Sequence, residues 1–378
     1  MSGRRLKVMV IVGTRPELIK LSRTLAEIEK QFTLVFVHTG QNYDYELNGI
    51  FFRDLGIRKP DYMLEAAQES AALTIANVIA KSDELMAQVK PDALLILGDT
   101  NSCLAAISAK RRKIPIFHME AGNRCFDQRV PEEINRKILD HISDINLPYT
   151  EHARRYLLAE GLRPETVIKT GSPMREILEY HRAGIEQSDV LARLKLQAGR
   201  YFVASAHRED NVDDPALLVK LLETLNALVA VYDLPLIFST HARTRKRLDA
   251  LDGNLKLDPR IEFMKPLGFI DYVHLQGKAK CVLSDSGSVT EEATILNFPA
   301  VTLRYTHERP EGMDEGTLIM CGLEAPAVLE AVRIVTAQHQ PARAFRMVAD
   351  YEPANVSQKV VRIIASYTDY VNRTVWHR

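Results

Sequence analysis

Cysteine is scarce in this chain of 378 residues, and its four cysteines lie far apart. Cys103, Cys125, Cys281 and Cys321 form no CxxC pair, and no histidine stands at ligand spacing from them. We therefore expect neither a zinc site nor a disulfide framework, and a reducing, cytoplasmic compartment fits this cysteine usage. No metal is predicted.

The sequence also lacks an excess of either charge. Lys+Arg and Asp+Glu both number 49. This balance argues against a nucleic-acid partner bound mainly through phosphate neutralisation. A local basic pocket for one small anion is still compatible with it.

No apolar run approaches the roughly 18–20 residues that cross a membrane, so no membrane partner is expected. The run VMVIV near the amino terminus follows basic residues and faintly resembles a signal peptide. It is too short for one, and the polar TRPE follows it directly, so we interpret it as a first strand.

Short apolar runs alternate with segments of helical period, which predicts parallel sheets covered by helices on both faces. The length suggests two domains of roughly 150–200 residues. The strand candidates are Leu6–Val12, Thr33–His38, Ala93–Leu97, Ile114–His118, Ile145–Leu147 and Val167–Thr170, then Tyr201–Ser205, Leu236–Ser239, Ile261–Met264, Cys281–Ser284 and Ala300–Leu303.

A domain boundary is expected at Gly171–Pro173, followed by a helical, polar stretch from Met174 to Arg200. The prediction is an α/β protein with two Rossmann-like domains, residues 1–172 and 173–355, and an active site in the cleft between them. Pro215–Val231 should form an amphipathic helix with a leucine face. A final helix within 356–378 should pack back on the first domain.

Charged residues crowd the break between a strand and a helix in Ile116–Arg136. The carboxylates are Glu120, Glu132 and Glu133, and the arginines are Arg124, Arg129 and Arg136. An open α/β sheet binds its ligand where strands end, so these groups are candidates for chemistry. Ion pairs on a solvated loop are the alternative.

Two further loops of the first half follow strands. The first, Gly13–Glu17, opens a helix that carries Arg15 and Lys20, and its free N–H groups and cations could bind an anion. A capped surface helix is the alternative. Asp99, in the second loop, could be a helix N-cap or an acid or base.

The second half carries phosphate-binding features after its own strands. His207 can donate to a phosphate or shuttle a proton, although a structural role is also open; His241 is a weaker candidate. Ser286, Gly287 and Ser288 open a helix that carries Glu291 and Glu292, where the backbone could approach a phosphate closely. A simple serine cap is the alternative there.

These features divide between the halves. The carboxylates Asp99, Glu120 and Glu132 come from the first, and phosphate-binding groups occur in both. We therefore expect the second domain to hold most of a nucleotide diphosphate, and the first to do the chemistry.

The motifs GTRPELIK, GDTNS, HMEAGNR…PEEINR, HRED, SDSGSVTEEA and THERPEG occur in this order. The chain resembles the non-hydrolysing UDP-N-acetylglucosamine 2-epimerases from Val8 to about Gly312. The resemblance implies a GT-B arrangement of the two domains, a homodimer, a UDP-sugar substrate and no cofactor. The family eliminates UDP across C1–C2 to form a glycal, and then adds UDP back with the proton on the other face.

The resemblance also implies roles for individual residues. Asp99, Glu120 and Glu132 would be the acid/base carboxylates, with His207 beside the departing diphosphate. The residues expected to bind UDP or its diphosphate are Arg15, Lys20, Arg124, Arg136, His241, Ser286, Gly287, Ser288, Glu292, Arg304, Glu308 and Arg309.

Two segments depart from the common family pattern. The common enzymes have AGLRT and a longer loop before PEE, where this chain reads AGNRCFDQRVPEE. They also carry a GQH-type segment, which serves an allosteric site in bacterial members, where this chain reads GQNYDYEL (Gly40–Leu47). Both resemble the branch that makes UDP-N-acetyl-L-fucosamine from UDP-2-acetamido-2,6-dideoxy-L-talose for capsule and O-antigen synthesis. Conversion of UDP-N-acetylglucosamine is the alternative; a GT-B glycosyltransferase, a hydrolysing relative and a UDP-sugar sensor are more distant ones.

Overall fold

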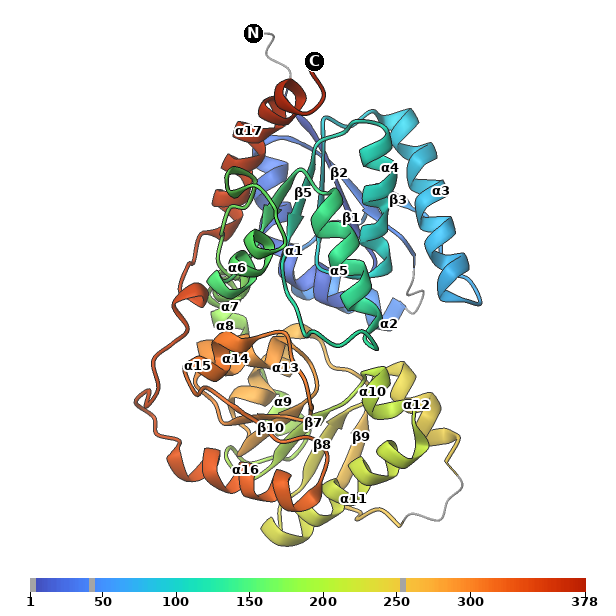
Figure 1. The fold of residues 1–378 in the computed structure, drawn as a ribbon. Coiled ribbons are helices and arrows are strands. Elements are labelled where there is room, and N and C mark those ends of the chain that lie inside the picture. The colour runs from blue at the N-terminus through green and yellow to red at the C-terminus, as the bar shows by residue number, and fades with distance from the viewer. Residues whose placement is uncertain (1–4, 41–44, 252–255) are drawn as a thin grey trace. The chain divides into compact units, whose positions relative to one another are not determined.

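The computed structural model describes residues 5–40, 45–251 and 256–378 (Figure 1). The chain divides into two compact units. Unit 1 comprises Met1–Tyr180 and Asp350–Arg378, and unit 2 comprises His181–Ala349. The Gly40–Leu47 segment falls partly outside the described residues, so the expectation about an allosteric site there stays a prediction.

Unit 1 contains a six-stranded parallel sheet in the order β3-β2-β1-β4-β5-β6. Its strands are β1 Lys7–Val12, β2 Thr33–His38, β3 Tyr62–Met63, β4 Ala93–Leu97, β5 Ile116–Met119 and β6 Ile145–Leu147. Its helices are α1 Arg15–Gln31, α2 Tyr45–Asp54, α3 Ala71–Val89, α4 Ala106–Arg111, α5 Pro131–Ile142, α6 Glu151–Ala159, α7 Met174–Tyr180 and α17 Val356–Thr374. The central strands are buried along their length because both faces carry aliphatic side chains under helices.

Unit 2 repeats this plan with the order β12-β11-β10-β7-β8-β9, again all parallel. Its strands are β7 Phe202–Ser205, β8 Leu236–Ser239, β9 Ile261–Met264, β10 Cys281–Ser284, β11 Ala300–Thr302 and β12 Ile319–Met320. Its helices are α8 Arg182–Glu186, α9 Val190–Arg193, α10 Glu209–Val212, α11 Pro215–Tyr232, α12 Ala242–Asp249, α13 Phe269–Gly277, α14 Ser288–Leu296, α15 Pro310–Asp314 and α16 Ala325–Gln338. The predicted two Rossmann-like domains are confirmed, whereas the cleft between them stays a prediction.

Each sheet reverses its strand order once, between β1 and β4 in unit 1 and between β7 and β10 in unit 2. Ligands of open α/β sheets bind outside the carboxyl ends of the strands at such switch points. The loops that begin at Gly13 and Gly98 follow β1 and β4, and those that hold His207 and Ser286 follow β7 and β10. The fold therefore puts the candidate residues of each unit where a ligand is expected.

The strand predictions failed at the sheet edges. The strands β3 and β12 were missed, because each is only two residues long and lies at an exposed edge of its sheet. Val167–Thr170 was wrong as a strand: it makes only an isolated bridge between Val167 and Asn146.

Helix α11 begins behind Pro215 as expected and is the one described helix long and apolar enough to cross a membrane. The statement that no apolar stretch approaches that length was therefore wrong. Most of the expected leucine face, including Leu221 and Leu225, lies in the core of unit 2, while Leu217 is only partly buried. One face of the helix is buried and the other is partly exposed, as in an amphipathic helix that covers a sheet.

Helix α17 belongs to unit 1, although 169 residues of unit 2 separate it from the rest (His181–Ala349). Val360 and Ile364 lie in the same core cluster as Leu18 and Leu25 of α1. The chain leaves unit 1 at Tyr180, eight residues beyond the boundary placed at residue 172. Because α17 packs against α1, it helps to fix the helix that the Gly13–Glu17 loop opens.

Candidate active site

Lys20 and Glu120 form a short ion pair at the carboxyl end of the first sheet. Lys20 comes from α1 and Glu120 follows β5, and Lys20 Nζ lies 2.5 Å from Glu120 Oε2. The two side chains are only 8% and 12% exposed, so water screens the pair weakly. The structure thus places one expected base beside one expected diphosphate-binding cation.

Glu120 adopts a left-handed backbone conformation, with φ at 60°. A side chain at such a φ costs about 1 kcal/mol or more, and such residues concentrate at functional sites. Gly122 follows with φ at 82°, and a Cβ there would lie 2.5 Å from the carbonyl oxygen of Ala153. The turn is thus tight, and Asn123 Nδ2 donates to Glu120 Oε1 at 3.3 Å within it.

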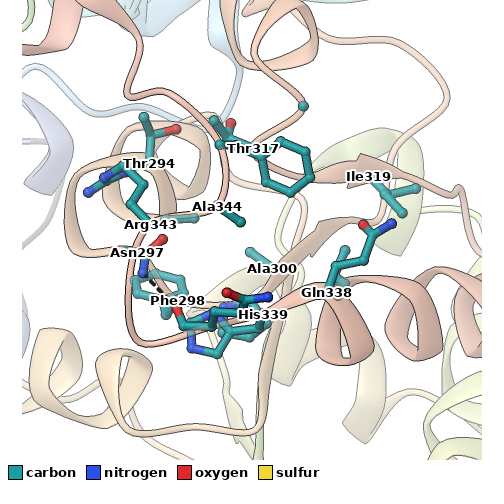
Figure 2. Close-up of a pocket in the computed structure, with 16 residues that line it drawn as sticks. Thr294, Asn297, Phe298, Ala300, Thr317, Ile319, Gln338, His339, Arg343 and Ala344 are labelled. Atoms are coloured by element: carbon teal, nitrogen blue, oxygen red, sulfur yellow. Dashed lines mark hydrogen bonds between the residues drawn. The ribbon is translucent and has the colours of Figure 1, made fainter.

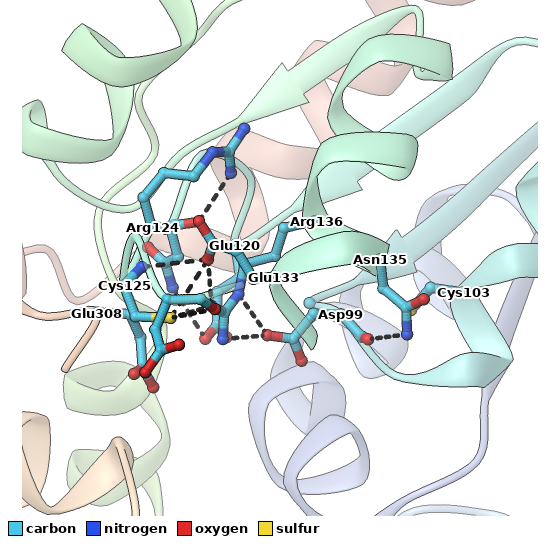
Figure 3. A network of polar contacts seen from close by, with 12 residues as sticks. Asp99, Cys103, Glu120, Arg124, Cys125, Glu133, Asn135, Arg136 and Glu308 are labelled. Carbon is cyan, nitrogen blue, oxygen red and sulfur yellow. Dashed lines mark hydrogen bonds and ion pairs between the residues drawn. The ribbon is translucent and has the colours of Figure 1, made fainter. Parts of the chain in front are cut away.

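Arg136 of α5 holds Asp99 on one side and Glu133 on the other (Figure 3). Its Nε and Nη2 both lie 2.7 Å from Asp99 Oδ2, and its Nη1 lies 3.0 Å from Glu133 Oε2. Glu133 is wholly buried and also accepts a hydrogen bond from the Cys125 amide. Asn135 donates to the Asp99 carbonyl at 2.8 Å. Asp99 is therefore fixed at both its backbone and its carboxylate.

Glu132 and Arg15 are more exposed than the buried Arg136. Glu132 lies in the first turn of α5 and is partly exposed, unlike its buried neighbour Glu133. The Arg15 guanidinium lies 5.5 Å from the ring centroid of Phe51 in α2. Both side chains are accessible enough to meet a ligand, which keeps their expected roles open.

Arg124 differs from the expectation that it binds substrate. Its side chain is fully buried, and its guanidinium contacts Asp140 at 2.7 Å and Glu160 at 2.7 and 2.8 Å. A further hydrogen bond goes to the carbonyl of Asn123. Since these acceptors use the guanidinium, we propose a structural role for Arg124 in place of substrate contact.

Glu17 forms hydrogen bonds with both the Gly13–Glu17 loop and the loop of Asp99, and sequence reasoning missed this role. Its buried carboxylate accepts hydrogen bonds from the amides of Gly13 at 3.0 Å and Thr14 at 2.8 Å. Thr100, next to Asp99, donates to it at 3.1 Å. Burial raises the pKa of Glu17 from 4.5 to about 7, with these hydrogen bonds opposing the rise.

A stability prediction follows from the raised pKa of Glu17. A folded-state pKa above the unfolded one stabilises the fold fully below pH 4.5, and the effect is lost as pH rises through about 7. The difference between the two pKa values of Glu17 corresponds to about 3 kcal/mol of unfolding free energy. Glu17→Gln should therefore reduce the fall in unfolding free energy between about pH 5 and pH 8, measured by denaturant titration. Glu29→Gln, on the same helix but exposed, is the control, and equal slopes for the wild type and Glu17→Gln would contradict the prediction.

In unit 2, His207 is held by the buried Asp285. His207 Nδ1 lies 3.0 Å from Asp285 Oδ1, while the ring is 40% exposed. The other oxygen of Asp285 accepts from the amides of His207 and Arg208 and from Asn211 Nδ2. Burial by itself would raise the pKa of Asp285, but the charge of His207 and these donors hold it well below its ordinary value. His207 is thus oriented with one ring edge toward solvent, 5.7 Å from the ring of His241.

The loop before α14 has the close packing that a phosphate site requires. Ser286 Oγ and Ser288 Oγ lie 3.1 Å apart, and all three residues of the loop are partly exposed. A Cβ on Gly287 would meet Glu308 Oε1 at 2.7 Å, so a larger residue there would have to displace the Glu308 carboxylate. The N–H groups of the first turn of α14 therefore stand beside small side chains, which is typical of phosphate binding.

Three other candidates of unit 2 lie within buried polar contacts. Arg304 and Arg208 contact the two oxygens of Glu308 at 2.7 and 2.9 Å. Gln276 donates to Glu292 at 2.9 Å. These contacts fix the loop that follows β11 beside the start of α14.

Arg309 is 2% exposed, and its Nη2 lies 2.9 Å from Glu291. This contact attaches the loop that carries Arg309 to helix α14. As with Arg124, we propose a supporting role for Arg309 in place of the expected contact with substrate.

A separate pocket of unit 2 lies at the other end of α14 (Figure 2). Thr294, Phe298, His339 and Arg343 are among its lining residues. The Arg343 guanidinium donates to the carbonyls of Thr294 and Ile295, which lie in the last turn of the helix. A cation there complements the helix dipole, so the fold explains Arg343 without a ligand.

The fold and the candidate site together indicate the class of protein. Both domains are doubly wound parallel sheets that carry polar candidate residues after their strands, as nucleotide-binding α/β proteins do. The sequence matches the family model of UDP-N-acetylglucosamine 2-epimerase over residues 26–365. The chain belongs to this family, whose members are isomerases, and this confirms the resemblance at the family level.

Several relatives are similar over nearly the whole chain. The structure of UDP-N-acetylglucosamine 2-epimerase from Rickettsia bellii is 55% identical, with a TM-score of 0.93, covering 99% of this chain and 100% of that one. The Methanocaldococcus jannaschii UDP-GlcNAc 2-epimerase in complex with UDP-GlcNAc and UDP is 32% identical, with a TM-score of 0.88, covering 96% and 100%. UDP-2,3-diacetamido-2,3-dideoxy-D-glucuronate 2-epimerase from Pseudomonas aeruginosa is 33% identical over 333 residues, covering 87% and 92%.

Proposed function

We propose that this protein inverts C2 of a UDP-2-acetamido sugar without hydrolysing it. The observation that carries the proposal is the pairing of two expected acid/base residues with cations, Glu120 with Lys20 and Asp99 with Arg136, at the carboxyl end of one sheet. Family membership supports the same reaction.

The chemistry requires both a base and a route for the leaving group. The C2 hydrogen of a 2-acetamido sugar is not acidified by a neighbouring carbonyl, so direct exchange is slow. In the proposed route a carboxylate takes the C2 proton, the C1–O bond to UDP breaks, and the electron pair forms a C1=C2 double bond. UDP then adds back to C1 while an acid delivers a proton to the opposite face of C2. Asp99, Glu120 and Glu132 supply these acids and bases.

The diphosphate gains charge as the C1–O bond breaks, so cations and N–H donors that face it accelerate the step. In this proposal Arg15 and Lys20 of unit 1 and His207 of unit 2 bind it. The first turn of α14 holds phosphate, and Glu292 accepts hydrogen bonds from ribose hydroxyls. Arg304 and Glu308 support this loop.

Two substrates have specific support. The loop AGNRCFDQRVPEE favours UDP-2-acetamido-2,6-dideoxy-L-talose, the precursor of UDP-N-acetyl-L-fucosamine in capsule and O-antigen synthesis. The name of the Rickettsia bellii relative favours UDP-N-acetylglucosamine equally. We further propose a homodimer in the cytoplasm, which rests on the resemblance alone.

Incubation with each candidate UDP-sugar in deuterated water, followed by NMR, tests the function. We expect deuterium at C2, appearance of the C2 epimer and no net release of free sugar. The panel should include the diacetamido uronate that the Pseudomonas aeruginosa relative is named for. Unlabelled substrate throughout the panel would refute the enzymatic claim, and release of free sugar would identify a hydrolase instead.

A further inference from the structure

His118 occupies a buried position between the turns that carry Asp99 and Glu120. It lies on β5 two residues before Glu120, and its side chain is 1% exposed. Nothing in the proposed reaction uses it. One ring nitrogen nevertheless contacts the Gly98 carbonyl next to Asp99, and the other contacts Asp140, which binds the turn after Glu120.

One nitrogen faces the turn of Asp99. His118 Nε2 lies 2.8 Å from the carbonyl oxygen of Gly98, which has φ at 76° and is followed directly by Asp99. A carbonyl oxygen only accepts, so Nε2 must carry a proton and donate. This bond fixes the peptide that leads into Asp99.

The other nitrogen faces Asp140, the carboxylate that binds the turn after Glu120. His118 Nδ1 lies 3.0 Å from Oδ1 of Asp140, a close ion pair with imperfect hydrogen-bond alignment. Asp140 is wholly buried and also accepts the Gly122 amide at 3.1 and 3.2 Å. A bare nitrogen this near a carboxylate oxygen would be repelled, so Nδ1 also carries a proton.

We propose that His118 is a positioning residue that stays doubly protonated and thereby holds together the two turns that carry Asp99 and Glu120. Neutral histidine has one N–H, so loss of a proton would release one of the two turns. The proposal rests on the proposed function only for the catalytic roles of Asp99 and Glu120.

The groups around His118 together favour its doubly protonated form. Burial lowers the pKa of His118, but the hydrogen bond and charge of Asp140, the Gly98 carbonyl and the charge of Asp99 raise it above its ordinary value overall. The titratable and charged groups around the pair are Asp140 and His141 of α5, Arg124 of the preceding loop, Glu160 after α6 and Asp99 after β4.

His38 is an internal control in the same sheet. It is as buried as His118, but its Nδ1 accepts a hydrogen bond from the Gly40 amide at 2.9 Å. Burial lowers the pKa of His38 to about 4. Two buried histidines of one sheet should therefore hold opposite protonation states at neutral pH.

The test is 15N NMR of histidine-labelled protein across the pH range of activity. We expect one buried histidine with protons on both nitrogens wherever kcat is maximal, and one with a bare Nδ1. If both buried rings show a bare nitrogen at a pH of full activity, the proposal is overturned. This spectrum needs no variant and no substrate.

Asp140→Asn provides the functional measurement. Removing the carboxylate charge should shift the decrease of kcat at high pH to lower pH by about one unit or more. The KM should stay within about threefold of the wild-type value. Unchanged pH dependence in a folded variant would overturn the proposal. If Asp140→Asn does not fold, the wild-type spectrum decides.

The two possible failures can be told apart. If no UDP-sugar is turned over, the proposed function fails, while the spectrum still reports the protonation of His118. The unfolding midpoint then serves as the second readout. A raised folded pKa stabilises below the unfolded pKa, and this stability should be lost as pH rises through the folded pKa of His118.

Discussion

Glu120→Gln should sharply slow deuterium exchange at C2 while leaving UDP affinity within a few fold. Glutamine preserves the shape of the side chain and its acceptor toward Lys20, but it can neither take nor deliver a proton. Acid–base groups contribute on the order of 10²- to 10⁴-fold to catalysis, and we expect a loss of that size. NMR measures the exchange, and isothermal titration with UDP measures the affinity.

The same substitution affects stability, because it removes the charge that faces a nearly buried Lys20. Breaking a buried pair from one side can cost about 3–5 kcal/mol, so a thermal melt must accompany the kinetics. The double variant Lys20→Met/Glu120→Gln should recover part of this stability without recovering exchange. Glu29→Gln, on α1 and exposed, is the matched control.

Two outcomes would contradict the assignment of Glu120. Loss of UDP binding in a folded Glu120→Gln protein would make the residue a structural support of the nucleotide site. Exchange at the wild-type rate would move the chemistry to Asp99 or Glu132. The left-handed backbone of Glu120 would then have no catalytic explanation.

The sequence was sufficient to predict the framework and the loops that carry the candidate residues. Apolar runs identified most of the strands, since a strand buried on both faces needs a continuous aliphatic run. Polar motifs directly after those runs identified the loops that begin at Gly13, Gly98, Glu120, His207 and Ser286. Edge strands β3 and β12 were missed because a strand of two residues at an exposed sheet edge is too short to stand out in the sequence.

Side-chain roles were harder to predict, because they depend on partners distant in sequence. Arg124 looked like a ligand residue, but its carboxylate partners Asp140 and Glu160 lie on later segments. The capping-box position of Glu17, three residues after Thr14, was a visible signal that predicts a local role. Its bond to Thr100, 83 residues away, was not visible in the sequence.

A common arrangement connects the candidate residues of both units. Asp99 contacts Arg136, Glu120 contacts Lys20, and His207 contacts Asp285, each with an ion-pair distance of 3.0 Å or less. In each pair one member is at least nine-tenths buried and the other is more accessible. Buried partners lose little freedom, so they hold the exposed groups in place before substrate arrives.

Asp285→Asn tests this arrangement in unit 2 and should lower kcat on the order of 10²-fold, a typical contribution of one acid–base group. The carboxylate accepts from two backbone amides and Asn211 besides facing His207. An amide in its place brings an NH₂ group toward donors, so the His207 ring should lose its fixed orientation. Steady-state kinetics with the accepted UDP-sugar measures the change in kcat and KM.

A double-variant cycle separates positioning from general destabilisation. If Asp285 acts through His207, Asp285→Asn should have little further effect on kcat once His207→Asn is present. Asp233→Asn, at a fully solvated carboxylate of the same unit, should match the wild type. Additive losses in the double variant would mean that Asp285 supports the fold of the loops independently of His207. Buried carboxylates would then hold the backbone at this switch point, and the orientation of His207 would need another cause.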